Sequence, residues 1–159
     1  MKFVIILSLA SLFIGCSHQK NVQTRDPSSQ RGLEILVNQH ENTILIEEDG
    51  VMVMNAKLVD KSRGECSKSI SPAGKFKVIE KHRKFRPSAY PGKILSHVVF
   101  YNSNHIIMQK IDAKRLSSGL IEMQCQAILL GKEDSERLFE ILEHYDAQFP
   151  NQQVRVTVE

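Results

Sequence analysis

Apolar and polar positions alternate in several short runs, which predicts a chain built mainly from β-strands. Residues 33–38 and 43–47 are apolar and rich in β-branched side chains, and the turn-like sequence QHEN separates them. The sequence EDG at 48–50 is a second turn signal, and residues 51–60 continue as a strand. The first part of the domain is therefore predicted to be a three-stranded meander.

The same alternation recurs further along the chain. Further strands are predicted at residues 75–80, 94–102, 105–112, 119–130 and 153–159. In the run 119–130, Ile121, Met123, Cys125, Ala127 and Leu129 would share one face of a strand. Ser71-Pro72-Ala73-Gly74 is a loop signal, and residues 82–93 are predicted to form a long basic loop with two prolines.

One segment has helical periodicity. Leu138, Ile141, Leu142, Tyr145 and Phe149 recur at helical spacing, and Pro150 ends the pattern. Asp134 or Ser135 is the expected N-cap, with acidic residues in the first turn. Strands, one late helix and a final valine-rich strand predict a β-rich sandwich or barrel with the helix packed on it.

The N-terminal segment differs from the rest of the chain. Lys2 precedes a run of about a dozen apolar residues, which is shorter than the about 20 that a spanning helix needs. The ending LFIGC resembles the lipobox of bacterial lipoproteins, with Phe13 where that motif usually has leucine. We therefore expect residues 1–15 to be a lipoprotein signal peptide and Cys16 to be lipidated; the alternative is a plain secretory signal.

Residues 16–31 are then the lipidated cysteine and a polar flexible tether, and residues 32–159 are a single domain. The formal charge of +3, about +2 without Lys2, is too weak a bias to indicate nucleic acid. Excluding Cys16 leaves Cys66 and Cys125, which an oxidising periplasm would join in a disulfide; the alternative is two buried thiols.

The order of segments resembles the catalytic domain of bacterial L,D-transpeptidases (YkuD-like). SPAGKF at 71–76 resembles that family's TPTGTF loop, and SSGLIEM at 117–123 stands where SHGCIRM would be. SERLFEIL at 135–142 resembles the family's helix, and VRVTV at 154–158 its closing strand. The resemblance implies a YkuD-like β-sandwich or barrel with one late α-helix packed on it and a C-terminal strand.

In that family the motif cysteine attacks a peptide carbonyl of the peptidoglycan stem, and an upstream histidine helps to form the thiolate. Here Ser117 and Gly119 match, whereas the cysteine position holds Leu120 and the arginine position holds Glu122. The motif histidine corresponds to Ser118, and the upstream histidine to Met108. The resemblance thus implies a motif whose frame remains while its chemistry is lost.

Three residues are candidate substitutes for the two lost groups. His105 lies three residues before Met108, but in a strand this offset turns it to the opposite face. Cys125, five residues after Leu120, and Cys66 are candidate substitute nucleophiles. Cys125 would point away from Leu120 if the segment were a continuous strand.

No histidine spacing indicates a metal site, and no cofactor is expected. The basic run around 75–93 is either a solvated surface or an electrostatic contact with anionic wall or lipid groups; the candidate wall-binding residues in it are Lys81, Arg83, Lys84, Arg86 and Tyr90.

We therefore expect a lipoprotein of the bacterial cell envelope that faces the periplasm, with Ser17 compatible with outer-membrane sorting. Its L,D-transpeptidase-like domain would bind peptidoglycan or a cell-wall enzyme without catalysis. The alternatives are an active cysteine transpeptidase or carboxypeptidase using Cys125 or Cys66, and a structural interaction domain without a ligand. The expected partners are therefore peptidoglycan or cell-wall enzymes and, through lipidated Cys16, a membrane; nucleic acid is not expected.

Overall fold

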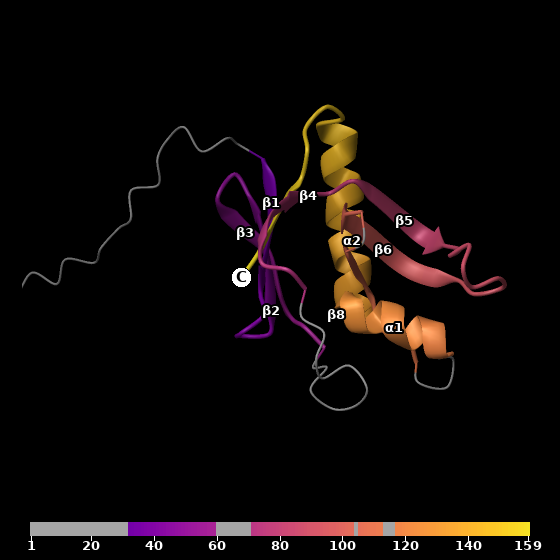
Figure 1. The fold of residues 1–159 in the computed structure, drawn as a ribbon. Helices are drawn as coiled ribbons and strands as arrows, with labels where there is room; N and C mark the ends of the chain where they lie inside the picture. The colour runs from indigo at the N-terminus through magenta and orange to yellow at the C-terminus, as the bar shows by residue number, and fades with distance from the viewer. Residues whose placement is uncertain (1–31, 60–70, 104, 113–116) are drawn as a thin grey trace, which may run out of the picture.

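The computed structural model describes residues 32–59, 71–103, 105–112 and 117–159, and it shows two β-sheets with helices packed against them (Figure 1). The mainly β architecture with a late helix and a C-terminal strand is the one that the sequence predicts. The predicted signal peptide, Cys16, the tether and Cys66 lie outside the described residues.

The first sheet has five strands in the order β3-β2-β1-β9-β4. These strands are β1 (Leu33–Asn38), β2 (Thr43–Glu48), β3 (Val51–Lys57), β4 (Gly74–Lys77) and β9 (Arg155–Val158). The meander β1-β2-β3 is confirmed, and Asp49 and Gly50 both have positive φ in the turn between β2 and β3. An Asp-Gly pair is favoured in such two-residue turns because their twist matches that of the strands. β9 runs parallel to β1 and antiparallel to β4, so it lies inside the sheet between these two strands.

The second sheet has four strands in the order β5-β6-β7-β8. These are β5 (Glu80–Phe85), β6 (Leu95–Asn102), β7 (His105–Gln109) and β8 (Ile128–Leu130). β7 and β8 pair in parallel, and the other neighbours are antiparallel. The predicted strand 75–80 is thus two strands in different sheets, and the first four residues of the predicted basic loop 82–93 belong to β5.

α2 (Lys132–Gln148) lies between the two sheets (Figure 1) and contributes to the main core. Leu138, Phe139, Leu142 and Tyr145 are buried in it beside apolar residues of both sheets. The helix starts earlier than predicted, with Gly131 as the N-cap residue, and Asp134 and Ser135 lie inside the first turn. The buried Ser135 hydroxyl donates to the carbonyl of Lys132 at 2.7 Å, which satisfies it inside the helix.

α1 (Ser118–Gln126) was not predicted, because the segment was interpreted as a strand that continued to residue 130. The helix covers the face of the second sheet that points away from α2, and with it encloses a second core. Buried residues of this core are Leu95, Val98, Ile106, Met108, Leu120, Ala127 and Leu129. The sequence pattern fits both structures, because the buried residues Leu120, Gln124 and Ala127 are also spaced to lie on one face of a helix.

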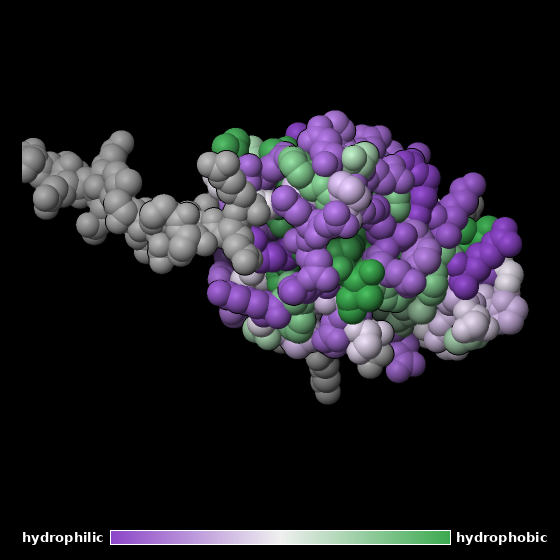
Figure 2. Space-filling view, turned by 90° about the horizontal axis from the view of Figure 1, so that it is seen from above, coloured by the Kyte–Doolittle hydropathy of each residue, from purple (hydrophilic) through white to green (hydrophobic). Residues whose placement is uncertain are grey.

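The outer surface is mainly hydrophilic, with small hydrophobic patches on the face shown in Figure 2. Within the described ranges, neither helix has the length and apolar character that crossing a membrane requires.

Candidate functional site

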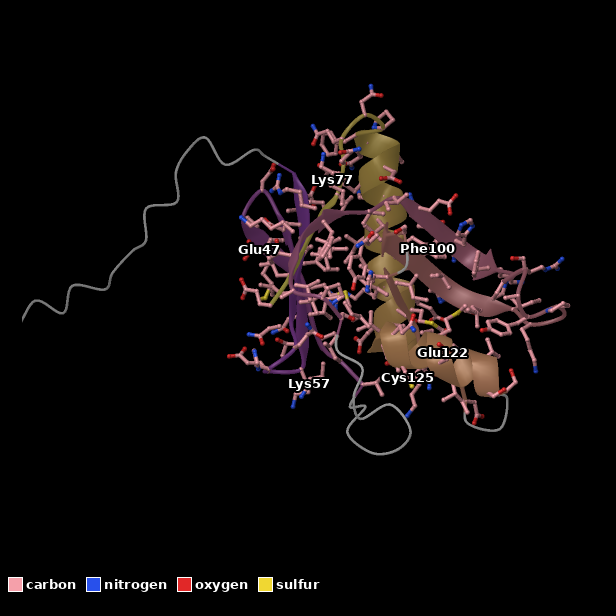
Figure 3. The ribbon with its side chains drawn as sticks, in the orientation of Figure 1. Glu47, Lys57, Lys77, Phe100, Glu122 and Cys125 are labelled. Carbon is pink, nitrogen blue, oxygen red and sulfur yellow. The ribbon has the colours of Figure 1, made fainter. Side chains whose placement is uncertain are left out.

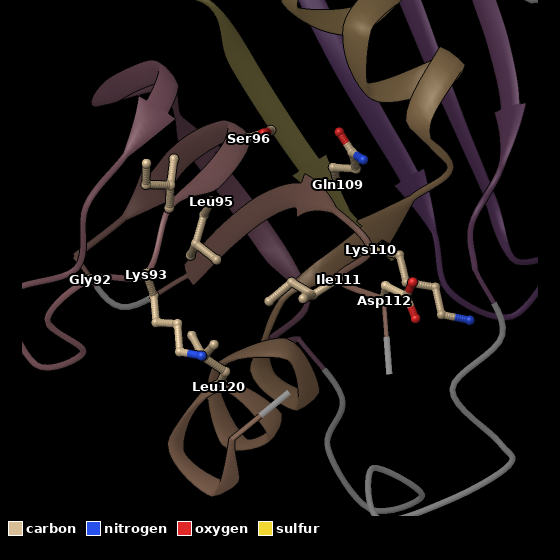
Figure 4. Close-up of a pocket in the computed structure, with 10 residues that line it drawn as sticks. Gly92, Lys93, Leu95, Ser96, Gln109, Lys110, Ile111, Asp112 and Leu120 are labelled. Carbon is tan, nitrogen blue, oxygen red and sulfur yellow. The ribbon is translucent and has the colours of Figure 1, made fainter. Parts of the chain in front are cut away.

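An open cleft of about 810 Å³ lies at the start of α1, between the loop that precedes β6 and the segment that follows β7 (Figure 4). Its apolar lining comes from Leu95, Ile111 and Leu120. Lys93 lines it from the loop before β6, and Lys110 and Asp112 line it from the segment after β7. The cleft thus combines an apolar floor with charged walls, which is typical of binding sites for small amphipathic ligands.

Leu120 and Met108, the two positions at which the resemblance would place a cysteine and a histidine, lie in the same core. Leu120 is 1% exposed and Met108 is 0% exposed, and both belong to the apolar cluster between α1 and the second sheet. Gln109, the neighbour of Met108, lines the cleft together with Leu120. The structure therefore brings these two sequence positions together, but neither side chain has an acidic, basic or nucleophilic group.

The remaining motif residues surround the first turn of α1. Ser117 is the N-cap residue with extended backbone (φ −103°, ψ 163°), but its side chain makes no capping hydrogen bond. Ser118 begins the helix and is exposed to solvent. Glu122 is also exposed and lies on the same helix as Cys125 (Figure 3).

Gly119 is in close contact with Tyr90 from the loop before β6. A Cβ atom at Gly119 would lie 2.2 Å from Cε1 of Tyr90, closer than side chains ever approach. The packing of an aromatic ring against α1 therefore favours glycine at this position.

A buried amide holds the cleft wall against α1. The side chain of Gln124 is 8% exposed, and its Oε1 accepts a hydrogen bond from the backbone N–H of Ile111 at 2.8 Å. This bond ties the segment after β7 to the helix. Because an unpaired buried amide is costly, this bond favours the position in which the segment after β7 lies against α1.

The cysteines do not contribute a described thiol to the cleft. Cys125 is 9% exposed on α1 and forms a disulfide. Because Cys66 lies outside the described residues, its pairing with Cys125 and its role as a substitute nucleophile remain predictions. In α1, Cys125 is rotated by about 140° from Leu120, so the strand argument for its direction no longer applies.

His105 and His97 do not line the cleft. The ring of His105 is 6.0 Å from that of Tyr101, which belongs to the main core, whereas Met108 belongs to the second core. His105 therefore faces away from the cleft. His97 has a φ of 51° within β6, and its ring lies 5.5 Å from Phe139 on the α2 side. In the described part of the chain, histidine, cysteine and acidic residues form no cluster able to hold a metal ion.

The predicted wall-binding residues do not form one surface. Lys81 pairs with Asp146, and Arg83 pairs with Glu143, so both cations are held against α2. The guanidinium of Arg83 also lies 5.4 Å from the ring centroid of Phe139. Lys84 and Arg86 are exposed. Tyr90 packs beside the cleft, in the second core.

Sequence reasoning missed three charged residues of the cleft, namely Lys93, Lys110 and Asp112. Lys93 ends the basic run that the sequence shows, but nothing in the run distinguishes it from its neighbours. Lys93 lines the cleft only because its loop folds against α1, which the sequence pattern does not predict. The sequence placed Lys110 and Asp112 inside a strand predicted to run to residue 112. In the structure β7 ends at Gln109, and both residues lie in the segment that follows it.

Several solved structures with a similar fold are described as L,D-transpeptidases. An L,D-transpeptidase of Stackebrandtia nassauensis matches 89% of this chain with a TM-score of 0.58 and 16% identity. One from Xylanimonas cellulosilytica matches 84% with a TM-score of 0.54 and 14% identity, and one from Enterococcus faecium matches 80% with the same score and identity.

The fold is that of the L,D-transpeptidases. The chain spans 61%, 63% and 50% of these three proteins, less than two thirds of each. No family model and no curated protein sequence matches it. The L,D-transpeptidase fold is thus retained at a level of sequence identity at which fold, and not activity, is transferred.

Proposed function

We propose that the protein is a lipid-anchored, periplasm-facing member of the cell envelope that binds peptidoglycan peptides in the Leu120 cleft without catalysing their transfer. The observation that carries this proposal is the packing of Leu120 and Met108 in one apolar core at the floor of an open cleft. A thiolate and an imidazole are needed for the family's chemistry, whereas shape and polar walls suffice for binding.

An active cysteine enzyme is the first alternative. It would need a free thiol at the cleft, and the disulfide of Cys125 removes that thiol from nucleophilic chemistry. Cys66 lies outside the described residues, so this alternative is tested directly with a carbapenem, which acylates the thiol of L,D-transpeptidases. We expect no mass shift of the purified protein. An adduct that is lost in Cys125→Ser or Cys66→Ser would overturn the proposal.

Binding is tested by co-sedimentation with purified murein sacculi. We expect the protein to pellet with sacculi, and Ser96→Trp, which places an indole in the cleft, to weaken this binding. Ser103→Trp is the matched control, because Ser103 is exposed in the turn between β6 and β7 and lies outside the cleft. Equal pelleting of both variants would show that the cleft is not the binding surface.

A structural interaction domain without a ligand is the second alternative. It predicts a filled groove, and the open volume of about 810 Å³ favours a ligand instead. A cell-wall enzyme as partner is distinguished by crosslinking: its capture without any binding of sacculi would replace peptidoglycan as the target.

The anchor is proposed from the sequence LFIGC alone. Metabolic labelling with palmitate should mark the wild-type protein and not Cys16→Ser, and the variant should be released with the periplasmic fraction. Labelling that persists in Cys16→Ser would refute lipidation at this residue.

A further inference from the structure

We propose that the cleft selects ligands with a free carboxylate, and that Lys93 is the residue that recognises it. This inference deepens the proposed function and rests on it, because it names the chemical group by which a peptide would be held. It concerns residues outside the motif that the resemblance identifies.

The ion pairs of the described residues leave Lys93 as an unpaired cation of the cleft. Lys81 and Arg83 are neutralised by carboxylates of α2, whereas no described carboxylate lies within salt-bridge distance of Lys93. In Figure 4 the amine of Lys93 lies beside Leu120, while Lys110 and Asp112 lie together at the other end of the cleft. The Leu120 end is therefore positively charged, and the opposite end carries both signs.

The loop that carries Lys93 is fixed in place by its own turns and by one contact with α1. The N–H of Tyr90 donates to the carbonyl of Pro87, and the N–H of Lys93 donates to that of Tyr90, each at 3.1 Å. Gly92 has a φ of 79°, which favours glycine and turns the chain before Lys93. Because Tyr90 packs on Gly119, the loop cannot shift without moving its ring off α1. We therefore regard Tyr90 as a positioning residue for Lys93.

The chemistry around Lys93 suits a carboxylate at the end of a peptide. Ile94 and Ile111, which line the cleft and keep exposed surface, can contact an aliphatic side chain, and the ammonium of Lys93 beside them can pair with the carboxylate. An ion pair beside an apolar floor is less screened by water than one on an open surface. An amide in place of the carboxylate would lose this charge–charge attraction while keeping the apolar contact.

The experiment measures the affinity of the full chain, purified in detergent, for fluorescently labelled muropeptides. The muropeptides are used in their native form and after carbodiimide coupling to ammonia, which converts their carboxylates to amides. We expect the native form to bind about fivefold more tightly at low salt, and this advantage to shrink at high salt. Lys93→Gln should remove the advantage, while Lys93→Arg should keep most of it.

The matched control is Lys57→Gln, which removes an exposed positive charge from the end of β3 in the first sheet, outside the cleft. It should leave the affinity for both forms unchanged. Tyr90→Ala should reduce the preference for the native form, because the loop loses its contact with α1. Circular dichroism of each variant tests whether it remains folded.

The outcomes separate the two proposals. Equal binding of native and amidated muropeptides, unchanged in Lys93→Gln, would overturn carboxylate recognition and leave peptide binding intact. Equal losses in Lys93→Gln and Lys57→Gln would show that only net charge matters and would also overturn it. Binding of neither form would refute the proposed function itself, and the selectivity of Lys93 with it.

Discussion

Gly119 occupies the second position of α1, and the ring of Tyr90 lies where its Cβ would be. In an ordinary helix, alanine is more favourable than glycine by about 1 kcal/mol. Here an added methyl group would displace an aromatic ring that packs in the second core. An added methyl group at this residue would therefore have two opposite effects on stability: it would favour the helix and disrupt the packing of the ring.

We expect Gly119→Ala to lower the free energy of unfolding by about 1 kcal/mol, since the lost ring packing outweighs the gain in helix propensity. In a Tyr90→Ala background the sign should reverse, because only the propensity remains. Urea denaturation of the two single variants and the double variant measures this coupling. Additive effects would show that the ring and the glycine do not interact.

Tyr101 presents a different residue-level problem, because its hydroxyl is buried and meets the geometry of no hydrogen bond within the described residues. Burial raises the pKa of Tyr101, and the nearby hydroxyl of Ser71 offsets part of that rise. The neutral phenol is thus favoured in the folded state. Below about pH 10 tyrosine is protonated in both the folded and the unfolded state, so this shift affects stability only at higher pH.

As the pH rises above the ordinary tyrosine pKa, the unfolded chain loses its proton first and becomes relatively more stable. Stability should therefore fall from about pH 10 upward, towards the raised pKa of the folded state. Tyr101→Phe should lose less stability over this range and change it little at pH 7, because it removes a buried hydroxyl without a partner. Urea denaturation at pH 7 and pH 10.5 tests this; identical alkaline losses in both proteins would contradict it.

At the scale of secondary structure, the helices on the two sides of the second sheet differ in how well the sequence predicts them. Periodicity predicted α2 because its apolar residues follow one helical stripe, but it failed for α1, whose short apolar run fits both periods. The outcome is decided by tertiary packing: Leu120 and Met123 must cover the apolar residues of β6 and β7. A helix that completes a second core leaves little trace in a nine-residue sequence.

Charged side chains join β5 to α2, and we expect this contact to contribute to stability. Arg83 pairs with Glu143 and also lies over the ring of Phe139. Because both charged groups are partly exposed, we expect Arg83→Gln to cost about 1 kcal/mol of stability at low salt. Part of this cost should disappear in 1 M salt, since screening weakens the ion pair and affects the packing of the side chain less.

The control for this prediction is Lys84→Gln, which removes a neighbouring charge that forms no ion pair among the described residues. Thermal unfolding of both variants at two salt concentrations measures the difference. If Lys84→Gln is as destabilising as Arg83→Gln, the pairing with α2 contributes nothing beyond net charge.

At the scale of the whole molecule, local turn chemistry revealed the β1-β2-β3 meander, whereas pairings between distant segments were not predictable. The parallel pairing of β1 with β9, and the separation of β4 and β5 into different sheets, depend on how the two layers close. The candidate site likewise depends on contacts between distant segments. The resemblance indicated Leu120 and Met108, but Lys93 enters the cleft only through a loop packed on α1.

Cys125 forms a disulfide, and we predict that its partner is Cys66. Such a bond closes a loop of about 60 residues and would stabilise the fold by about 4 kcal/mol in the chain-entropy view. A non-reduced digest should contain one peptide pair joined through these two cysteines, and Cys66→Ser should expose one reactive thiol on unfolding. Cys16→Ser is the control and should leave the pair intact. A Cys16–Cys125 crosslink would contradict both this pairing and lipidation of Cys16, because a thioether sulfur cannot also form a disulfide.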